Sequence, residues 1–105
     1  MAELTVISWR DIPAQVVARS GRTRASFELP ARFQIAIDRA AMNAGLFGSD
    51  NYLEEWRRTS RPCGEDLEAE ATAEVERLVA NHPPEAIDLL VANNGHSDGH
   101  DGENQ

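Results

Sequence analysis

Lysine is missing from this sequence, and all ten of its permanently cationic side chains are arginines. Cysteine occurs once, so no intramolecular disulfide can form. No apolar run approaches the ~18 residues of a membrane span, and the N-terminus, Met1 to Leu4, lacks the basic and apolar segments of a signal peptide. The sequence therefore predicts a cytoplasmic protein without a disulfide framework and without a membrane partner.

The motifs of several enzyme classes are missing as well. The chain has no P-loop, no dinucleotide fingerprint, no HExxH and no paired CxxC. The carboxylates between Glu65 and Glu76 recur on the polar face of an expected helix, whereas a catalytic carboxyl usually needs burial or a close like charge. The sequence therefore favours a protein that is not an enzyme, with no catalytic residue, no metal site and no cofactor.

Positive charge is scarce in the second half of the chain. The net charge is −8: residues 1–62 hold nine arginines against seven acidic residues, and residues 63–105 hold one arginine against eleven. Nucleic-acid binding needs cationic side chains that displace counterions, so this balance argues against a nucleic-acid partner. A GC-rich codon bias explains the absence of lysine, but individual arginines can still make the planar, bidentate contacts that lysine cannot make.

Three strands are predicted in the first third of the chain, over residues 4–9, 14–19 and 22–29. The first leads into a bend at Pro13, and Ser20-Gly21 suits a tight turn between the second and third. The third strand alternates between a face expected to be buried (Thr23, Ala25, Phe27 and Leu29) and a face expected to be exposed (Arg22, Arg24, Ser26 and Glu28).

Helical spacing dominates the rest of the chain. A helix is predicted over 31–44 and is expected to be buried on two sides, because Ile35 and Met42 add a second apolar line to its face. A short helix from Ser49 to about Arg58 would project Tyr52, Leu53 and Trp56 on one face, and 59–64 is predicted to be a loop. Two amphipathic helices follow, over 65–80 and from Pro83 to about Gly95.

Together these elements predict an α+β fold. A small N-terminal antiparallel sheet of about three strands would pack against three to four helices in a single domain over residues 1–94. Residues 95–105 are acidic and rich in glycine and histidine, with nothing apolar to bury, so we expect a disordered tail.

Two segments of the chain resemble a known family. Residues 6–16, Val-Ile-Ser-Trp-Arg-Asp-Ile-Pro-Ala-Gln-Val, and the residues Arg32-Phe33-Gln34 and Ile37 to Met42 look like the small bacterial "virulence factor" domain family, over roughly residues 4–80. The resemblance implies an accessory or adaptor role. Similar domains are associated with one-carbon and corrinoid methyl-transfer proteins, or stand beside a NifU-like scaffold domain and helical repeats. Neither neighbouring domain is found in this sequence.

The candidate binding residues are Trp9, Arg10, Asp11 and Gln15 at the first strand end, with Arg19, Arg22 and Arg24 on the exposed strand face. Side chains at strand ends are commonly held on a rigid scaffold for binding, and the Arg10 guanidinium can form a bidentate contact with a carboxylate or phosphate. The alternative is structural: Arg10 pairs with Asp11 or Asp38 to fix the bend, and Trp9 lies in the core.

Two further candidates are weaker. Cys63 precedes a helix N-terminus and is near Arg61, which favours a thiolate, but Glu65, Asp66 and Glu68 oppose a second negative charge. In the tail, His96 and His100 could bind a metal loosely together with Asp98 and Asp101, although such a segment gives its ligands no fixed geometry.

The sequence therefore leads to three functional hypotheses. The first is a non-enzymatic accessory protein of a bacterial cytoplasmic pathway whose partner is another protein. The second, implied by the resemblance alone, is a small subunit or accessory enzyme of folate- or corrinoid-dependent methyl transfer. The third is a thiol redox protein that uses Cys63.

Overall fold

The first three strands form an antiparallel meander in the computed structural model, which describes residues 1–46 and 48–96. Strand β1 (Glu3–Trp9) pairs with β2 (Ile12–Ser20), and β2 pairs with β3 (Thr23–Glu28). The turn between β2 and β3 is Gly21-Arg22, with Gly21 at φ +60°, one residue later than the sequence predicted. Arg22 therefore lies in the turn and not on the strand face.

Residues 12 and 13, expected in a bend, belong to β2. Pro13 pairs with Ser8, and the register then shifts so that Ile7 faces Gln15. Such a bulge accepts a proline because the ladder is interrupted there and a missing amide hydrogen costs little. Only Arg10 and Asp11 remain to connect β1 with β2.

A fourth strand, β4 (Trp56–Pro62), occupies the segment that the sequence divided between a short helix and a loop. It pairs antiparallel with β1 along its whole length, so the strand order is β3-β2-β1-β4. The preceding helix, α2 (Asp50–Glu54), is correspondingly short. The predicted α+β class is confirmed, and the predicted loop over 59–64 is wrong.

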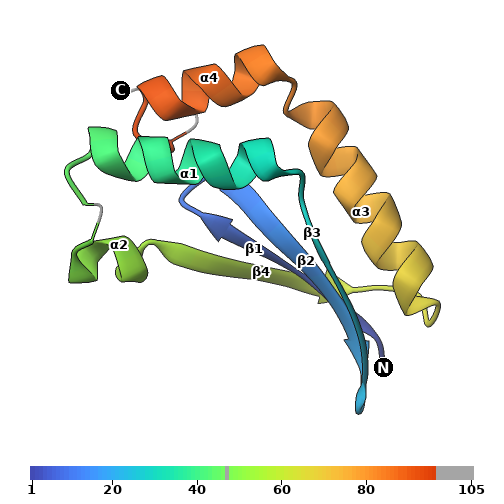
Figure 1. Cartoon of the computed structure of the whole chain (residues 1–105). Coiled ribbons are helices and arrows are strands. Elements are labelled where there is room, and N and C mark those ends of the chain that lie inside the picture. The colour runs from blue at the N-terminus through green and yellow to red at the C-terminus, as the bar shows by residue number, and fades with distance from the viewer. Residues whose placement is uncertain (47, 97–105) are drawn as a thin grey trace, which may run out of the picture.

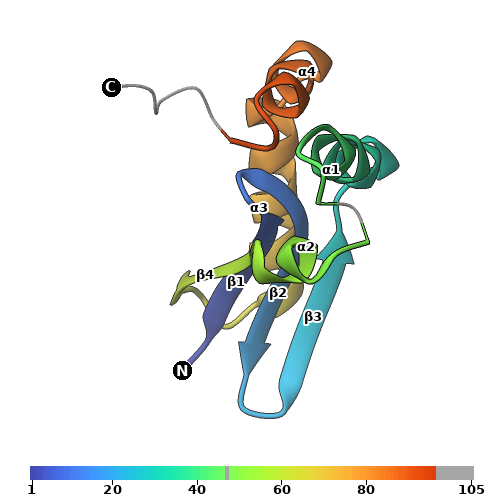
Figure 2. The same cartoon turned by 90° about the vertical axis from the view of Figure 1, so that its left-hand side faces the viewer.

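The remaining helices are α1 (Ala31–Asn43), α3 (Leu67–Asn81) and α4 (Pro84–Ala92). Helix α3 packs against β2 and β3 on one face of the sheet, while α1 packs against α4 at one end of the sheet. In Figure 2, α3 lies behind the strands, and the lower part of the opposite face has no helix over it. We call this opposite side the open face of the sheet.

The core lies between the sheet, α1, α3 and α4, and its largest fully buried side chains are Trp9, Phe33, Leu4, Ile12, Ile37 and Val16. Several apolar residues expected in the core are exposed instead. Ile35 and Met42 are each 56% exposed, so α1 is buried on one side and not on two. Leu53 on α2 and Phe27 on the edge strand β3 are also exposed, and so is Thr23.

None of the helices in the described residues is long and apolar enough to cross a lipid bilayer. The predicted tail lies outside the described residues from Ser97 onward. Gly95 and His96 are described, and Gly95 is buried against the turn between β1 and β2.

Candidate functional site

Trp9 closes the end of β1 and is completely buried. Its indole Nε1 donates a hydrogen bond of 2.9 Å to the carbonyl oxygen of Tyr52 on α2, and the two rings stack with their centroids 5.6 Å apart. The indole therefore fills the core and anchors α2 to the first strand. Trp9 therefore lies in the core, as the structural alternative to a binding role predicted.

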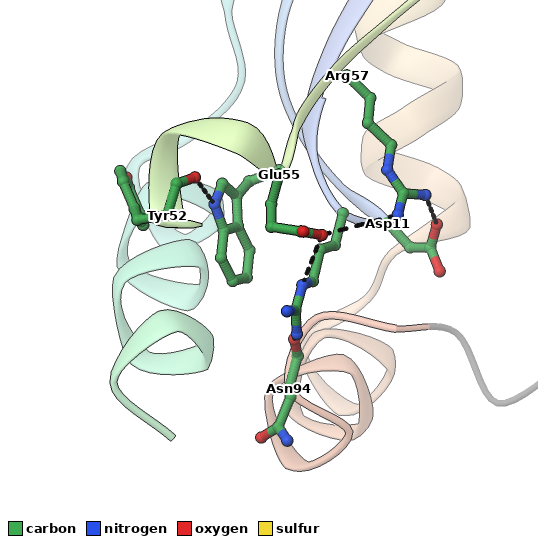
Figure 3. A network of polar contacts seen from close by, with 7 residues as sticks. Asp11, Tyr52, Glu55, Arg57 and Asn94 are labelled. Atoms are coloured by element: carbon green, nitrogen blue, oxygen red, sulfur yellow. Dashed lines mark hydrogen bonds and ion pairs between the residues drawn. The ribbon is translucent and has the colours of Figure 1, made fainter. Parts of the chain in front are cut away.

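Arg10 is the first residue of the two-residue turn and has a positive φ of 52°. Its side chain is 13% exposed. Nε donates to Glu55 Oε1 at 3.0 Å and Nη1 donates to the carbonyl oxygen of Asn94 at 2.8 Å, while the guanidinium lies 5.0 Å from the centre of the Trp9 ring (Figure 3). The ion-pair partner of Arg10 is thus Glu55, where the sequence suggested Asp11 or Asp38.

Asp11 extends the same network. Its carboxylate lies 3.9 Å from Nη1 of Arg57, whose Nη2 lies 3.8 Å from Glu55. Its backbone N–H donates to the carbonyl oxygen of Gly95 at 2.8 Å, and that of Arg10 donates to the carbonyl oxygen of Glu55. We call this cluster the hairpin end: Trp9, Arg10, Asp11, Tyr52, Glu55, Arg57, Asn94 and Gly95. It ties the first hairpin to α2, β4 and the end of α4.

Gln15 and Arg24 lie elsewhere, on the open face of the sheet. Directly opposite residues of paired strands point to the same face. Arg19 pairs with Arg24 and with Glu3, and Arg58 of β4 pairs with Ile7, which is four residues after Glu3 on β1. Three arginine side chains therefore share the open face. We call Arg19, Arg24 and Arg58 the arginine face.

The guanidinium groups of the arginine face have no ion pair and no hydrogen bond within residues 1–46 and 48–96. Arg61 and Arg77 differ: Arg61 pairs with Glu74 of α3 at 3.0 Å, and Arg77 pairs with the same carboxylate. The side chain of Gln15 donates a hydrogen bond of 2.7 Å to Ser26 on the open face. Arg22 lies at the adjoining turn and is exposed.

Two hollows mark the open face. The smaller, about 220 Å³, is lined by Thr5, Ile7, Gln15, Val17 and the three arginines. The larger, about 810 Å³, lies toward α1 and is lined by Ile7, Ala14, Gln15, Glu28, Leu29, Ala31, Gln34, Trp56 and Arg58. Arg19 was expected on the exposed strand face, but Arg58 was not among the predicted candidates, because it lies on the strand that was taken for the end of a helix.

Cys63 follows β4 and is half-buried, and its backbone N–H donates to the carbonyl oxygen of Ala2. Burial raises the pKa of the thiol, and the charge of Glu70 raises it further, while Arg61 lowers it. A raised pKa reduces the thiolate fraction at neutral pH, and the thiolate is the reactive species. The surroundings of Cys63 therefore do not favour redox or nucleophilic chemistry.

The histidines of the described chain do not form a metal centre. No three His, Cys, Asp or Glu side chains of residues 1–46 and 48–96 are grouped so that they could hold a metal ion. His82, beside α3, makes a 2.7 Å hydrogen bond through Nδ1 with the carbonyl oxygen of Leu78 and stacks edge-on against Phe33. His100, Asp98 and Asp101 lie outside the described residues.

A family model described as "Virulence factor" matches residues 7–91. The chain belongs to the virulence factor family. The matched segment runs from β1 to α4, so it includes the whole arginine face, and the hairpin end except for Asn94 and Gly95. Neither the curated proteins nor the solved structures that were compared with this family member gave a significant match. The family description names no reaction.

Proposed function

We propose that this member of the virulence factor family is a non-enzymatic accessory protein of the bacterial cytoplasm that binds another protein through the arginine face. The observation that supports the proposal is the absence of internal partners for Arg19, Arg24 and Arg58 in the described chain. Arginine is enriched in protein interfaces, where its planar group can bind a carboxylate with two hydrogen bonds. Three such groups on one sheet face make a cationic surface on a chain whose net charge is −8.

The hairpin end contributes to this function indirectly. Its hydrogen bonds and ion pairs join β1, β4 and the end of α4, and therefore fix the positions of two of the strands that build the open face. A surface on fixed strands loses little conformational entropy when a partner binds. Trp9, Arg10 and Asp11 thus serve the interface by holding the sheet, while Gln15, Arg19 and Arg24, with Arg22 at the rim, are the sequence candidates that face a partner.

The proposal is tested by placing a photo-crosslinking amino acid at Ser60, an exposed residue on the open face, or at Glu76, an exposed residue of α3 on the opposite side of the sheet. We expect crosslinks to a defined protein from position 60 in living cells and none to that protein from position 76. Changing Arg19, Arg24 and Arg58 together to glutamate should remove the crosslink, because like charges then oppose an acidic partner.

Arg39→Glu is the matched control, since Arg39 is an exposed arginine on α1 that lines neither hollow. The crosslink should survive this change, and circular dichroism should show that both variants are folded. A crosslink from position 76 but not from position 60, or a crosslink from position 60 that persists in the triple variant, would contradict the proposal.

A further inference from the structure

The two hollows of the open face adjoin each other, and we call them together the groove. They share Ile7, Gln15 and Arg58, which lie on three neighbouring strands. The groove therefore runs from the first turn of α1, across the sheet, to the paired residues Arg19 and Arg24 near the turn between β2 and β3. It is long enough to take several consecutive residues of an extended chain.

The two ends of this groove differ in chemistry. Toward α1 the lining includes the half-buried side chains of Ala14 and Trp56 and the buried side chain of Leu29. Toward the turn it includes Thr5, Arg19 and Arg24. Arg58 lines both hollows. A ligand that fits this arrangement carries a large apolar group at one end and negative charges along the rest.

The spacing of the arginines suits separate carboxylates. From the register, Arg58 and Arg19 are four residues apart along the strands and two strands apart across the sheet. At ~3.3 Å per residue and ~4.8 Å per strand, their Cα atoms are roughly 16 Å apart, a span of about five residues of extended peptide. Acidic side chains at both ends of such a peptide can each reach one arginine site.

Carboxylates also suit the charge of this face better than a polyphosphate does. Glu3 and Glu28 lie on the same face as the three arginines, beside Arg19 and Gln15. A nucleic acid carries a charge on every nucleotide and depends on a continuous cationic surface, which these two carboxylates and the net charge of −8 oppose. A peptide can place its few charges opposite the arginines and leave neutral residues beside the glutamates.

Resting on the proposed function, we infer that the partner contributes an extended acidic segment to this groove. A large apolar side chain of the segment lies against Trp56 and Ala14, and carboxylates farther along the segment pair with Arg58 and with Arg19 and Arg24. The apolar contact removes the exposed part of the Trp56 ring from water, and the carboxylates supply the missing partners of the arginine face.

The inference is tested by selecting binders to the full chain from a displayed library of random peptides. The enriched peptides are then synthesised with a fluorescent label, and their affinity is measured by anisotropy. We expect enrichment of several acidic residues beside one large apolar residue. Arg24→Gln and Arg58→Gln should each weaken binding by about tenfold, and amidation of the acidic residues should abolish it.

Arg39→Gln is the matched control and should change the affinity by less than about twofold. Failure to enrich any peptide, enrichment of peptides without acidic residues, or binding that is indifferent to Arg24→Gln and Arg58→Gln would overturn the inference. Tighter binding of a single-stranded oligonucleotide than of the selected peptides would also overturn it, in favour of a nucleic acid.

These results separate the inference from the proposed function. If no peptide is selected while the crosslink from position 60 still depends on the three arginines, the partner binds through a folded surface and only the acidic segment is wrong. If acidic peptides are selected but position 60 gives no crosslink in cells, the chemistry of the groove stands and the proposed function is wrong.

Discussion

The hairpin end and the arginine face use the same residue type in opposite ways. Arg10 is 13% exposed, and its guanidinium donates to a carboxylate and to a backbone carbonyl and lies over an indole. Arg19, Arg24 and Arg58 are exposed and have no such partner in the described chain. The comparison teaches that the side chains of a conspicuous sequence motif can all be engaged in contacts within the fold, while less conspicuous residues remain available for binding.

The largest expected effect separates the two tryptophans. Trp9→Ala should lower the free energy of unfolding by about 3 to 5 kcal/mol, because it removes a fully buried side chain and leaves a cavity. Trp56→Ala, at a half-buried residue of the groove, should cost no more than about 2 kcal/mol. Urea unfolding followed by circular dichroism measures both. Equal losses would show that the groove and the hairpin end form one structural unit.

A smaller effect separates the arginines. Arg10→Ala should lower stability by about 1 to 3 kcal/mol, because Glu55 and the carbonyl of Asn94 lose a charged donor in a largely buried place. Arg24→Ala and Arg58→Ala should change it by less than about 0.5 kcal/mol. Thermal unfolding of the three variants gives the comparison. A stable Arg10→Ala protein that fails to bind its partner would show that Arg10 belongs to the interface.

The glycine of the hairpin end allows a sharper test. Gly95 has φ +93°, and a Cβ there would lie 2.9 Å from Cζ3 of Trp9, so Gly95→Ala should cost about 1 to 2 kcal/mol. Gly21→Ala is the control, because Gly21 also has a positive φ but nothing lies within 4 Å of its Cβ position. The difference between their unfolding midpoints isolates the contact with Trp9. A larger loss of stability in Gly21→Ala than in Gly95→Ala would contradict the tight contact between Gly95 and Trp9.

The smallest effect uses Cys63, which belongs to neither region, as a reporter. Its raised pKa keeps the thiol protonated at neutral pH, so alkylation should be slower than that of a free thiol and should accelerate as the pH rises above neutrality. Glu70→Gln should lower the pKa and speed the reaction, because one of the charges that disfavours the thiolate is removed. Arg58→Ala should leave the rate unchanged, and a faster reaction in that variant would show that the open face supports the rest of the fold. Iodoacetamide labelling followed by mass spectrometry measures the rates.

Most elements were predictable because their local patterns are strong. Alternating side chains identified β1 and β3, and helical spacing identified α1, α3 and α4. Strand β4 could not be found in this way because six of its seven residues are exposed, so it shows no apolar alternation. Its neighbour α2 was extended into it, since Tyr52 and Trp56 have helical spacing although Trp56 lies on the strand.

The site was predictable only in part. The exposed face of β3 was expected, and Arg24 lies there, but the partner of Arg10 is 45 residues away in sequence and no local pattern points to Glu55. Arg58 joins the arginine face only through the pairing of β4 with β1. The prediction that α1 is buried on two sides was wrong for a related reason. Ile35 and Met42 are spaced seven residues apart, as core residues often are, yet nothing in the described chain buries them.

The pairing of β4 with β1 also bears on the order of folding. Strands β1, β2 and β3 are joined by short turns and can pair early, whereas β4 must return to β1 after α1 and α2, with Thr5 and Ser60 facing each other across 55 positions of sequence. Contacts between distant parts of a chain form slowly because a long loop must close first. Since Arg58 arrives with β4, a nascent or misfolded chain that has formed the meander alone presents Arg19 and Arg24 but no groove. Binding at the groove would therefore discriminate the finished molecule from any chain in which β4 has not paired with β1.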